Sequence, residues 1–224
     1  MPDIKKIIDD LTLEEKISLL SGFDAWQTHK IDRLGIPSIK MSDGPNGVRG
    51  DGNSGKSSAC FPCAITIGST WNLNLINRLG EELAAEAKLK DVDVLLGPTI
   101  NIHRHPLGGR HFECFSEDPF LTGKVAIEYV KGVQSKNIAA CLKHFVGNDT
   151  EFERYTVSSN IDEKTLREIY LLPFEMAIKE ANAKVVMSAY NKLNNIYCSS
   201  HENILISILK DEWRFDGYVV SDWG

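Results

Sequence analysis

The sequence predicts an α/β fold built around a parallel sheet. Short apolar runs alternate with longer helical patterns along all 224 residues. The apolar runs contain little polar alternation, which is typical of strands that are buried on both faces. Polar, glycine-rich and charged segments follow the ends of these runs. Both a closed barrel and an open doubly wound sheet would show this one-sided pattern, so it does not choose between them.

Five runs of this kind predict the strands, which we place at residues 38–42, 92–96, 138–142, 184–189 and 217–221. Valine, isoleucine and leucine are common in them, as in strands that lie inside a sheet. A closed parallel barrel requires eight strands over roughly 250 residues. The chain therefore has too few strands for a complete barrel.

Helices are predicted between the strands from their start signals. Thr12 and Glu15 form a capping box that opens a short helix ending near Gly22. Asn72 and Asp162 are expected to cap helices that run to about 90 and 180, and further helices are expected at 120–136 and 204–213. Pro173 should kink the helix that contains it, because proline has no N–H to donate.

Composition narrows the class of protein and of partner. The chain is 42% hydrophobic and 25% charged, which suits one globular domain with a sizeable core. A net charge of −6 and the lack of a basic run argue against a nucleic-acid partner. No apolar stretch approaches the roughly 20 residues that span a bilayer, so no membrane partner is expected.

Cysteine usage and the N-terminus predict a cytoplasmic protein. The N-terminal residues lead into an amphipathic helix rather than the apolar stretch of a signal peptide. Five cysteines are scattered along the chain, which fits reduced thiols better than a disulfide framework. Cys60 and Cys63 have the spacing of a redox or zinc pair, but we interpret them as incidental buried thiols.

A nucleotide-binding motif supports one alternative function. Residues 50–57, Gly-Asp-Gly-Asn-Ser-Gly-Lys-Ser, match the phosphate-binding loop of nucleotide hydrolases letter by letter. Such a loop needs a strand directly before it and a helix directly after it. Here the segment 45–49 separates the motif from the preceding strand, and Pro62 interrupts a following helix. A flexible glycine-serine loop explains the match more simply.

A metal-dependent barrel hydrolase is a second alternative. His103, His105, His144 and Asp222 all follow predicted strands and are residue types that bind catalytic metals. Arg104 and Lys143 alternate with these histidines, however, and cations next to a divalent metal are unfavourable. We therefore predict no metal site and no cofactor.

The side chains that follow the strands better suit a neutral, polyhydroxylated ligand. Carboxylates and guanidinium groups can pair with vicinal hydroxyls, and tryptophan can stack on the apolar face of a sugar ring. The residues that supply these groups are Asp43, Arg49, Arg110, Lys143, His144, Arg154 and Trp223. Asp222 stands at the C-terminal tip of a strand, where it could act as a nucleophile. A simpler interpretation is that the arginines neutralise Glu113, Glu117 or Glu153 and that His144 belongs to the core.

Five ordered motifs carry a family resemblance. They are Asp43-Gly-Pro45, Gly108-Gly-Arg-His-Phe-Glu113 with Ser116-Glu-Asp-Pro119, Lys143-His144-Phe145, Met187-Ser-Ala-Tyr190-Asn191 and Ser221-Asp222-Trp223. Together they resemble the N-terminal domain of glycoside hydrolase family 3, and within it the β-glucosidases. The resemblance implies a (β/α)8 TIM-type barrel, truncated after about six strands. Residues 1–224 would then be a partial barrel domain without the C-terminal α/β sandwich domain of the family.

The resemblance also implies a reaction and a set of site residues. The expected reaction is retaining hydrolysis of terminal, non-reducing β-D-glucosyl residues in a small β-glucoside or oligosaccharide, with Asp222 as the catalytic nucleophile. Asp43, Arg110, Lys143 and His144 would bind the sugar hydroxyls. The residues that would line the same subsite are Arg49, Arg154, Met187, Tyr190 and Trp223. Cations near Asp222 are expected to keep its carboxylate ionised.

One catalytic group is not found in the sequence. Retaining hydrolysis needs a second carboxyl group about 5–5.5 Å from the nucleophile, as general acid and base. In the β-glucosidases that glutamate lies in the second domain, and the histidine used by the N-acetylglucosaminidase branch has no counterpart in residues 146–154. The isolated chain is therefore expected to be weak or inactive without a separate C-terminal polypeptide. The alternative is a non-catalytic, sugar-binding fragment.

Overall fold

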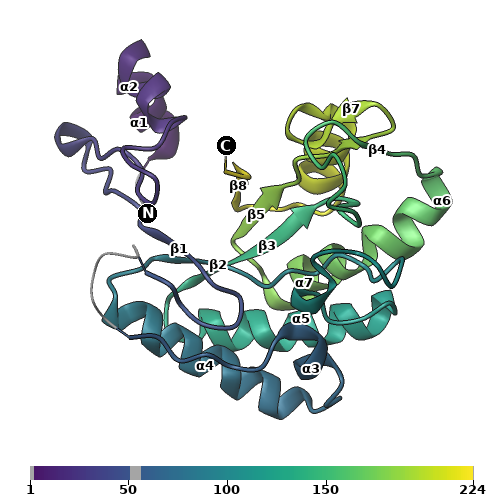
Figure 1. The fold of residues 1–224 in the computed structure, drawn as a ribbon. Helices are drawn as coiled ribbons and strands as arrows, with labels where there is room; N and C mark the ends of the chain where they lie inside the picture. The colour runs from purple at the N-terminus through teal and green to yellow at the C-terminus, as the bar shows by residue number, and fades with distance from the viewer. Residues whose placement is uncertain (1–2, 51–56, 224) are drawn as a thin grey trace.

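The order of the strands in the sheet identifies a barrel-type fold. The computed structural model describes residues 3–50 and 57–223, and a parallel sheet of five strands lies at its centre (Figure 1). The strands are β1 (Met41–Asp43), β2 (Val94–Leu96), β3 (Ala139–Phe145), β5 (Val185–Ser188) and β8 (Tyr218–Ser221), in the spatial order β1-β2-β3-β5-β8. Each strand is added on the same side of the one before it. A doubly wound sheet would reverse direction at a switch point, so the order is that of a partial barrel.

Three long helices cover the outer face of the sheet: α4 (Leu73–Leu89), α5 (Pro119–Gln134) and α7 (Leu172–Ala181) (Figure 1). The predicted cap of α4 is confirmed, because the Asn72 side chain accepts a hydrogen bond from the backbone N–H of Leu75. α4 and α5 cross closely at two glycines. A Cβ atom on Gly80 would stand 2.6 Å from the carbonyl oxygen of Tyr129, so no larger residue fits there.

The helix that was predicted to kink at Pro173 is interrupted just before this residue. Asp162 caps α6 (Glu163–Thr165), which continues as the π-helical segment η3 (Leu166–Tyr170) before α7 begins. Pro173 lies in the first turn of α7, where its missing N–H costs no helical hydrogen bond. The helix before β8, η5 (Asn203–Glu212), is also π-helical, which the sequence did not predict.

Shorter elements surround this framework. α1 (Ile4–Asp10) precedes α2 (Leu13–Leu19), whose predicted capping box between Thr12 and Glu15 is present. A second, small sheet contains β4 (Ser158–Ser159), β6 (Lys192–Leu193) and β7 (Ile196–Tyr197). The remaining short helices are η1 (Asp32–Leu34), α3 (Ala64–Gly68), η2 (His111–Glu113) and η4 (Cys198–Ser200).

The two faces of the main sheet carry different apolar clusters. The outer face packs residues such as Leu95, Leu142 and Val186 against the helices, in the larger cluster of the molecule. The inner face carries a smaller set, which we call the inner apolar cluster: Met41, Val94, Leu96, Cys141, Val185 and Met187. Trp26 and Trp223 pack against this cluster from the segments before β1 and after β8.

The interpretation of Cys60 and Cys63 as buried thiols was wrong. Cys60 is exposed and Cys63 is only partly buried, because they lie on a surface loop just before α3. Cys114, Cys141 and Cys198 are buried, and all five cysteines are free thiols.

Two further points concern alternative functions. Residues 51–56, the main part of the nucleotide-binding motif, lie outside the described residues. Within the described ranges, no helix has the length and apolar content to cross a membrane.

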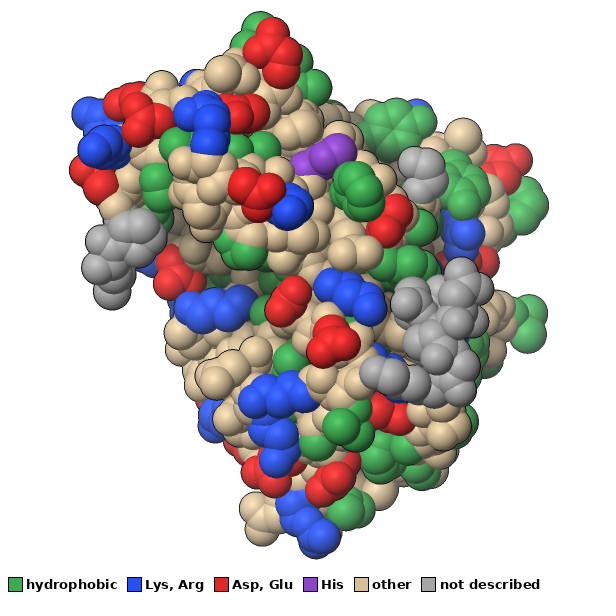
Figure 2. All heavy atoms as spheres, turned by 90° about the vertical axis from the view of Figure 1, so that its left-hand side faces the viewer, with side chains coloured by type: hydrophobic (Ala, Val, Ile, Leu, Met, Phe, Trp, Pro, Cys, Tyr) green, Lys and Arg blue, Asp and Glu red, His purple; other side chains and the backbone are tan. Residues whose placement is uncertain are grey.

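The face with the N-terminal segment carries acidic and basic side chains interspersed with each other (Figure 2).

Candidate active site

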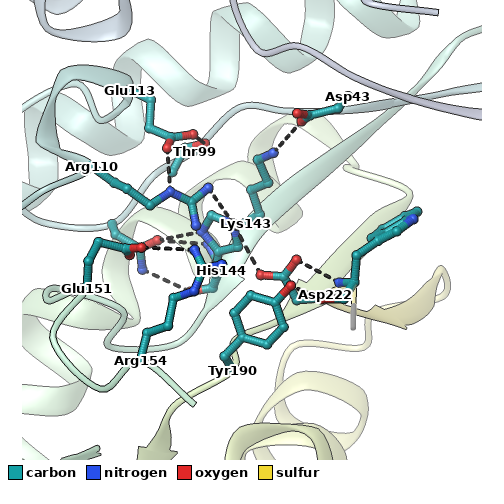
Figure 3. A network of polar contacts seen from close by, with 12 residues as sticks. Asp43, Thr99, Arg110, Glu113, Lys143, His144, Glu151, Arg154, Tyr190 and Asp222 are labelled. Atoms are coloured by element: carbon teal, nitrogen blue, oxygen red, sulfur yellow. Dashed lines mark hydrogen bonds and ion pairs between the residues drawn. The ribbon is translucent and has the colours of Figure 1, made fainter. Parts of the chain in front are cut away.

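On three strands, the side chains that face the inner side of the sheet are apolar along the strand and become charged at its C-terminal end. Side chains alternate between the faces of a strand, so a residue two positions further along faces the same side. Three pairs follow this rule: Met41 and Asp43, Cys141 and Lys143, and Val220 and Asp222. Charged groups from distant parts of the sequence therefore meet above the inner apolar cluster (Figure 3).

Asp43 and Lys143 form the first contact of this group. The Lys143 ammonium nitrogen lies 2.9 Å from Asp43 Oδ1, and the lysine side chain is only 5% exposed. Arg49 approaches the other oxygen of the same carboxylate at 3.1 Å from a mostly exposed position. Burial favours the neutral form of Asp43, but the two cations outweigh it and lower the pKa of this carboxyl group.

Helix α4 fixes the loop that carries Arg49. The Glu86 side chain accepts hydrogen bonds from the backbone N–H groups of Val48 and Ala59, at 3.3 and 2.8 Å. The buried Lys90 ammonium donates to the Val48 carbonyl oxygen at 2.5 Å and also to the Ser58 hydroxyl. The chain on both sides of the loop is thus tied to one helix, and this anchors the position of Arg49 next to Val48.

Arg110 is held in place by a carboxylate and points toward the centre of the group. Its Nε lies 2.5 Å from Glu113 Oε1, and the other oxygen of Glu113 accepts from the Thr99 hydroxyl at 3.0 Å. The Arg110 Nη2 atom lies 3.1 Å from Nε2 of His144. One end of the guanidinium is therefore neutralised while the other faces His144.

His144 is among the most enclosed polar side chains of the molecule. It is 2% exposed, and its backbone and ring contact the buried side chain of Asn101. Burial is the main cause that lowers its pKa well below the ordinary value, and Lys143 and Arg110 act in the same direction. These effects favour the neutral imidazole at His144.

Asp222 faces this imidazole from the end of β8. Its Oδ1 accepts a hydrogen bond from the Trp223 backbone N–H at 2.8 Å. Its Oδ2 is buried, accepts no hydrogen bond from a described residue and lies 3.6 Å from His144 Nε2. Burial raises the pKa of this carboxyl group, whereas the hydrogen bond from Trp223 and the charges of Lys143 and Arg110 lower it. The expectation that the cations keep Asp222 ionised stays a prediction.

An aromatic and cationic cluster lies beside Asp222. The Arg154 guanidinium stacks on the rings of Tyr155 and Tyr190, at 4.9 and 5.1 Å from their centroids. The Tyr190 hydroxyl donates to the Trp223 carbonyl oxygen and lies next to the Asp222 carboxylate (Figure 3). Arg154 also pairs with Glu151 at 3.0 Å.

Met187 lies at the base of the site and Trp223 at its edge. Met187 is 1% exposed within the inner apolar cluster, beneath the charged groups. The Trp223 indole N–H donates to the Ala25 carbonyl oxygen at 2.7 Å, and the ring packs on Trp26. Trp223 and Asp222 line a groove of about 390 Å³ between β8 and the segment before β1.

The side chains of the metal alternative do not converge. His103 stacks on His111 and its ring nitrogen contacts the Cys114 carbonyl oxygen at 2.9 Å, whereas His144 faces Asp222. Within residues 3–50 and 57–223, no three side chains of the metal-binding types gather at one point.

Three residues of the site were missed in the sequence: Asn101, Glu151 and Tyr155. Asn101 lies in the polar segment after β2, but many polar residues share that segment. Tyr155 follows Arg154 directly, and an arginine next to an aromatic residue is the one signal that could have drawn attention to it.

The fold agrees with comparisons to known proteins. Residues 7–224 match the model of the glycosyl hydrolase family 3 N terminal domain. A beta-glucosidase of Rhizobium radiobacter is 57% identical over 98% of this chain, and the thermostable beta-glucosidase B of Acetivibrio thermocellus is 51% identical over 99%. The chain spans 27% and 30% of the lengths of these two relatives.

Solved structures of beta-glucosidases also match this chain. The beta-glucosidase of Kluyveromyces marxianus, determined in complex with glucose, superposes with a TM-score of 0.96 at 49% identity. This match covers 100% of the chain described here and 27% of the other protein. Beta-glucosidase 3B of Thermotoga neapolitana, also with glucose, gives 0.92 at 43% identity over 99% of this chain and 34% of its own. The chain therefore belongs to glycosyl hydrolase family 3.

Proposed function

We propose that the charged group on the inner face binds the terminal glucosyl residue of a β-glucoside and that Asp222 is the nucleophile of a retaining hydrolysis. The single observation that carries this proposal is the position of Asp222. Its buried Oδ2 accepts no hydrogen bond from a described residue, and it lies among Lys143, Arg110 and His144. Relatives named beta-glucosidase, two of them solved with glucose, support the substrate class.

The side chains around Asp222 complement the hydroxyls of a sugar. Asp43 is an acceptor and Lys143 and Arg110 are donors, while the His144 ring lies beside them, in contact with Arg110. Arg49 and Arg154 extend the donor set, while Tyr190 and Trp223 provide apolar surface for the C–H face of the ring. Met187 closes the base of the site.

The proposed chemistry begins with the Asp222 carboxylate. One of its oxygens attacks the anomeric carbon, the bond from that carbon to the leaving oxygen breaks, and a covalent glycosyl ester forms. Water then cleaves the ester, with net retention. Burial disfavours the ionised form in the free site, and a sugar hydroxyl that donates to Asp222 would stabilise that form on binding.

We assign the second catalytic carboxyl group, the general acid and base, to another polypeptide or domain. The nearby carboxylates Glu113 and Glu151 are both engaged, with Arg110 and Arg154 respectively. We propose that the acid and base glutamate belongs to a C-terminal α/β sandwich domain and that the chain alone has little turnover. A cytoplasmic location is part of the same proposal.

A mechanism-based label tests the nucleophile without the missing acid. A 2-deoxy-2-fluoro-β-glucoside with a good leaving group needs a nucleophile but little help from an acid. We expect intact-mass analysis to show one adduct per chain, on Asp222, and none in Asp222→Asn. Asp216→Asn, an exposed carboxylate paired with Lys184, is the matched control and should label normally.

The same experiment separates the alternatives. Folded protein that binds glucose without forming an adduct would identify a non-catalytic sugar-binding chain, a role that the engaged Glu113 and Glu151 also favour. Turnover of an aryl β-glucoside at the rate of a full-length relative would contradict the proposed need for a second polypeptide.

A further inference from the structure

Asn101 is a buried amide that contacts His144 at three points. It lies on the loop after β2 and is 4% exposed. Its Nδ2 donates to the His144 carbonyl oxygen at 2.9 Å, and its Oδ1 accepts from the His144 backbone N–H at 2.8 Å. The same Oδ1 lies 3.3 Å from ring nitrogen Nδ1 of His144.

The backbone of His144 fixes the orientation of this amide. A backbone N–H can only donate and a carbonyl oxygen can only accept, so the oxygen of Asn101 must face the N–H and its nitrogen must face the carbonyl. The atom next to Nδ1 is therefore the amide oxygen. Because this oxygen can only accept, the proton of a neutral His144 ring belongs on Nδ1.

The contact at the other ring nitrogen, Nε2, requires the same tautomer. Arg110 Nη2 lies 3.1 Å from His144 Nε2, and a guanidinium can only donate. Nε2 must therefore accept this hydrogen bond with its lone pair and carry no proton. Asn101 and Arg110 thus select one arrangement of the proton from two sides of the ring.

We infer that Asn101 is a positioning residue that holds His144 as the neutral tautomer with its proton on Nδ1. Nε2 then stays free of a proton, 3.6 Å from the Asp222 carboxylate. A proton on Nε2 would instead be donated to Asp222 Oδ2 and would occupy the oxygen that attacks the sugar. The last step rests on the proposed function, whereas the tautomer itself does not.

The charges that face the ring support a neutral state. Arg110, Lys143 and Arg154 are the cations that disfavour an imidazolium, and Asp222 is the carboxyl group that favours it. Glu113 and Glu151 pair with Arg110 and Arg154, and Glu151 and Asp149 line the same small cavity as His144. Asn101 adds no charge, so it selects the tautomer without favouring the protonated ring.

Nitrogen NMR of ring-labelled histidine tests the tautomer directly and needs no sugar. We expect the His144 signals, assigned with His144→Gln, to show a protonated Nδ1 and an unprotonated Nε2 from about pH 5 to 8. In Asn101→Asp, the new carboxylate should stabilise the imidazolium, so His144 should gain a second proton within this range. A protonated Nε2 in the native chain, or no change in Asn101→Asp, would overturn the inference.

Two controls accompany this measurement. His201, a buried histidine after η4, serves as an internal reference that Asn101→Asp should leave unchanged. Asn160→Asp adds the same charge on an exposed loop and should not alter the His144 signals.

The rate of fluoroglucoside labelling then connects the tautomer to Asp222. We expect Asn101→Asp to label at least tenfold more slowly at about pH 5 than at about pH 8, relative to the native chain. In a His144→Gln background, Asn101→Asp removes the same amide donor to the carbonyl oxygen of residue 144, but no ring is left to protonate, so the extra slowing at about pH 5 should disappear. An equal loss in both backgrounds would show that Asn101 acts through the backbone and would contradict the inference. A native chain that does not label, but has the expected NMR signals, would refute the proposed function alone.

Discussion

The two strands that carry the central charged groups, β3 and β8, differ in how the molecule supports them. β3 lies in the middle of the sheet, between β2 and β5, and its Lys143 and His144 are almost fully buried. β8 lies at the edge of the described sheet and pairs only with β5 there. Its residues are half-buried or exposed. The proposed sugar-binding groups on β3 are therefore fixed by the fold, whereas the proposed nucleophile follows a less buried edge strand.

Breaking the ion pair at the end of β3 should have the largest effect. Lys143→Met leaves the Asp43 carboxylate with only the exposed Arg49, and we expect the free energy of unfolding to fall by roughly 2–4 kcal/mol. Urea unfolding followed by circular dichroism measures this loss. Lys124→Met, which removes an exposed pair with Glu180, should cost less than about 1 kcal/mol. Equal losses of unfolding free energy in Lys143→Met and Lys124→Met would contradict the expectation that the buried pair matters more.

Hydrogen exchange compares the two strands in the native chain. The N–H groups of Cys141 and Lys143 donate to Gly97 and Pro98, and that of Tyr218 donates to Lys184. We expect the Tyr218 amide to exchange at least about 30-fold faster, which corresponds to about 2 kcal/mol, because an edge strand can open locally. Uniform protection of all three amides would mean that the sheet opens only as a whole.

A buried carboxyl group on the loop after β3 should make stability depend on pH. Burial raises the pKa of Asp149 to about 6, above its unfolded value of about 3.9, although Arg104 opposes the shift. The folded state binds the extra proton between these values, so this stabilising contribution is full below about pH 4 and is lost as the pH rises through 6.

Asp149→Asn should remove this dependence. We expect the variant to be more stable than the native chain by on the order of 2 kcal/mol at about pH 8, with the gain disappearing toward pH 4. Thermal unfolding at several pH values measures the difference. Asp9→Asn, an exposed residue of α1, is the control and should show no comparable gain. A gain that persists unchanged at low pH would contradict the linkage.

The smallest effect is expected at the edge of the site. Trp223→Phe keeps an aromatic ring against Trp26 but removes the hydrogen bond to Ala25. We expect a loss of about 0.5–1 kcal/mol in the free energy of unfolding. Trp71→Phe, at a tryptophan that is 74% exposed, should change it less. A larger loss for Trp223→Phe would contradict this expectation. It would show that the packing of Trp223 on Trp26 stabilises β8 more than one hydrogen bond does.

Sequence reasoning predicted the strands and most of the charged group for the same reason. The five apolar runs fall on β1, β2, β3, β5 and β8, and the residues that follow them face the inner side of the sheet. Asp43, Lys143, His144 and Asp222 were found because a charge directly after a buried strand is a local pattern. Such patterns can be seen without knowing which strands are neighbours.

The rest depends on contacts that have no local signal. Asn101 and Glu151 are ordinary polar residues in polar segments, and their roles arise only because the fold brings them to His144 and Arg154. The rise in the Asp222 pKa could not be predicted, because the cations were visible in the sequence whereas the degree of burial was not. The π-helical geometry of η5 likewise follows from packing rather than from helix propensity.

The order of the strands also has a consequence for how the sheet forms during synthesis. Each parallel strand pairs with the one that left the ribosome before it, so β1, β2, β3, β5 and β8 can add one at a time to a growing edge. Every new strand is exposed only until the next βα unit arrives and covers it. The Lys143–Asp43 contact needs only β1 and β3 in place, so it does not depend on the strand that carries Asp222. A sheet with a switch point would instead have to grow in two directions from its first strand.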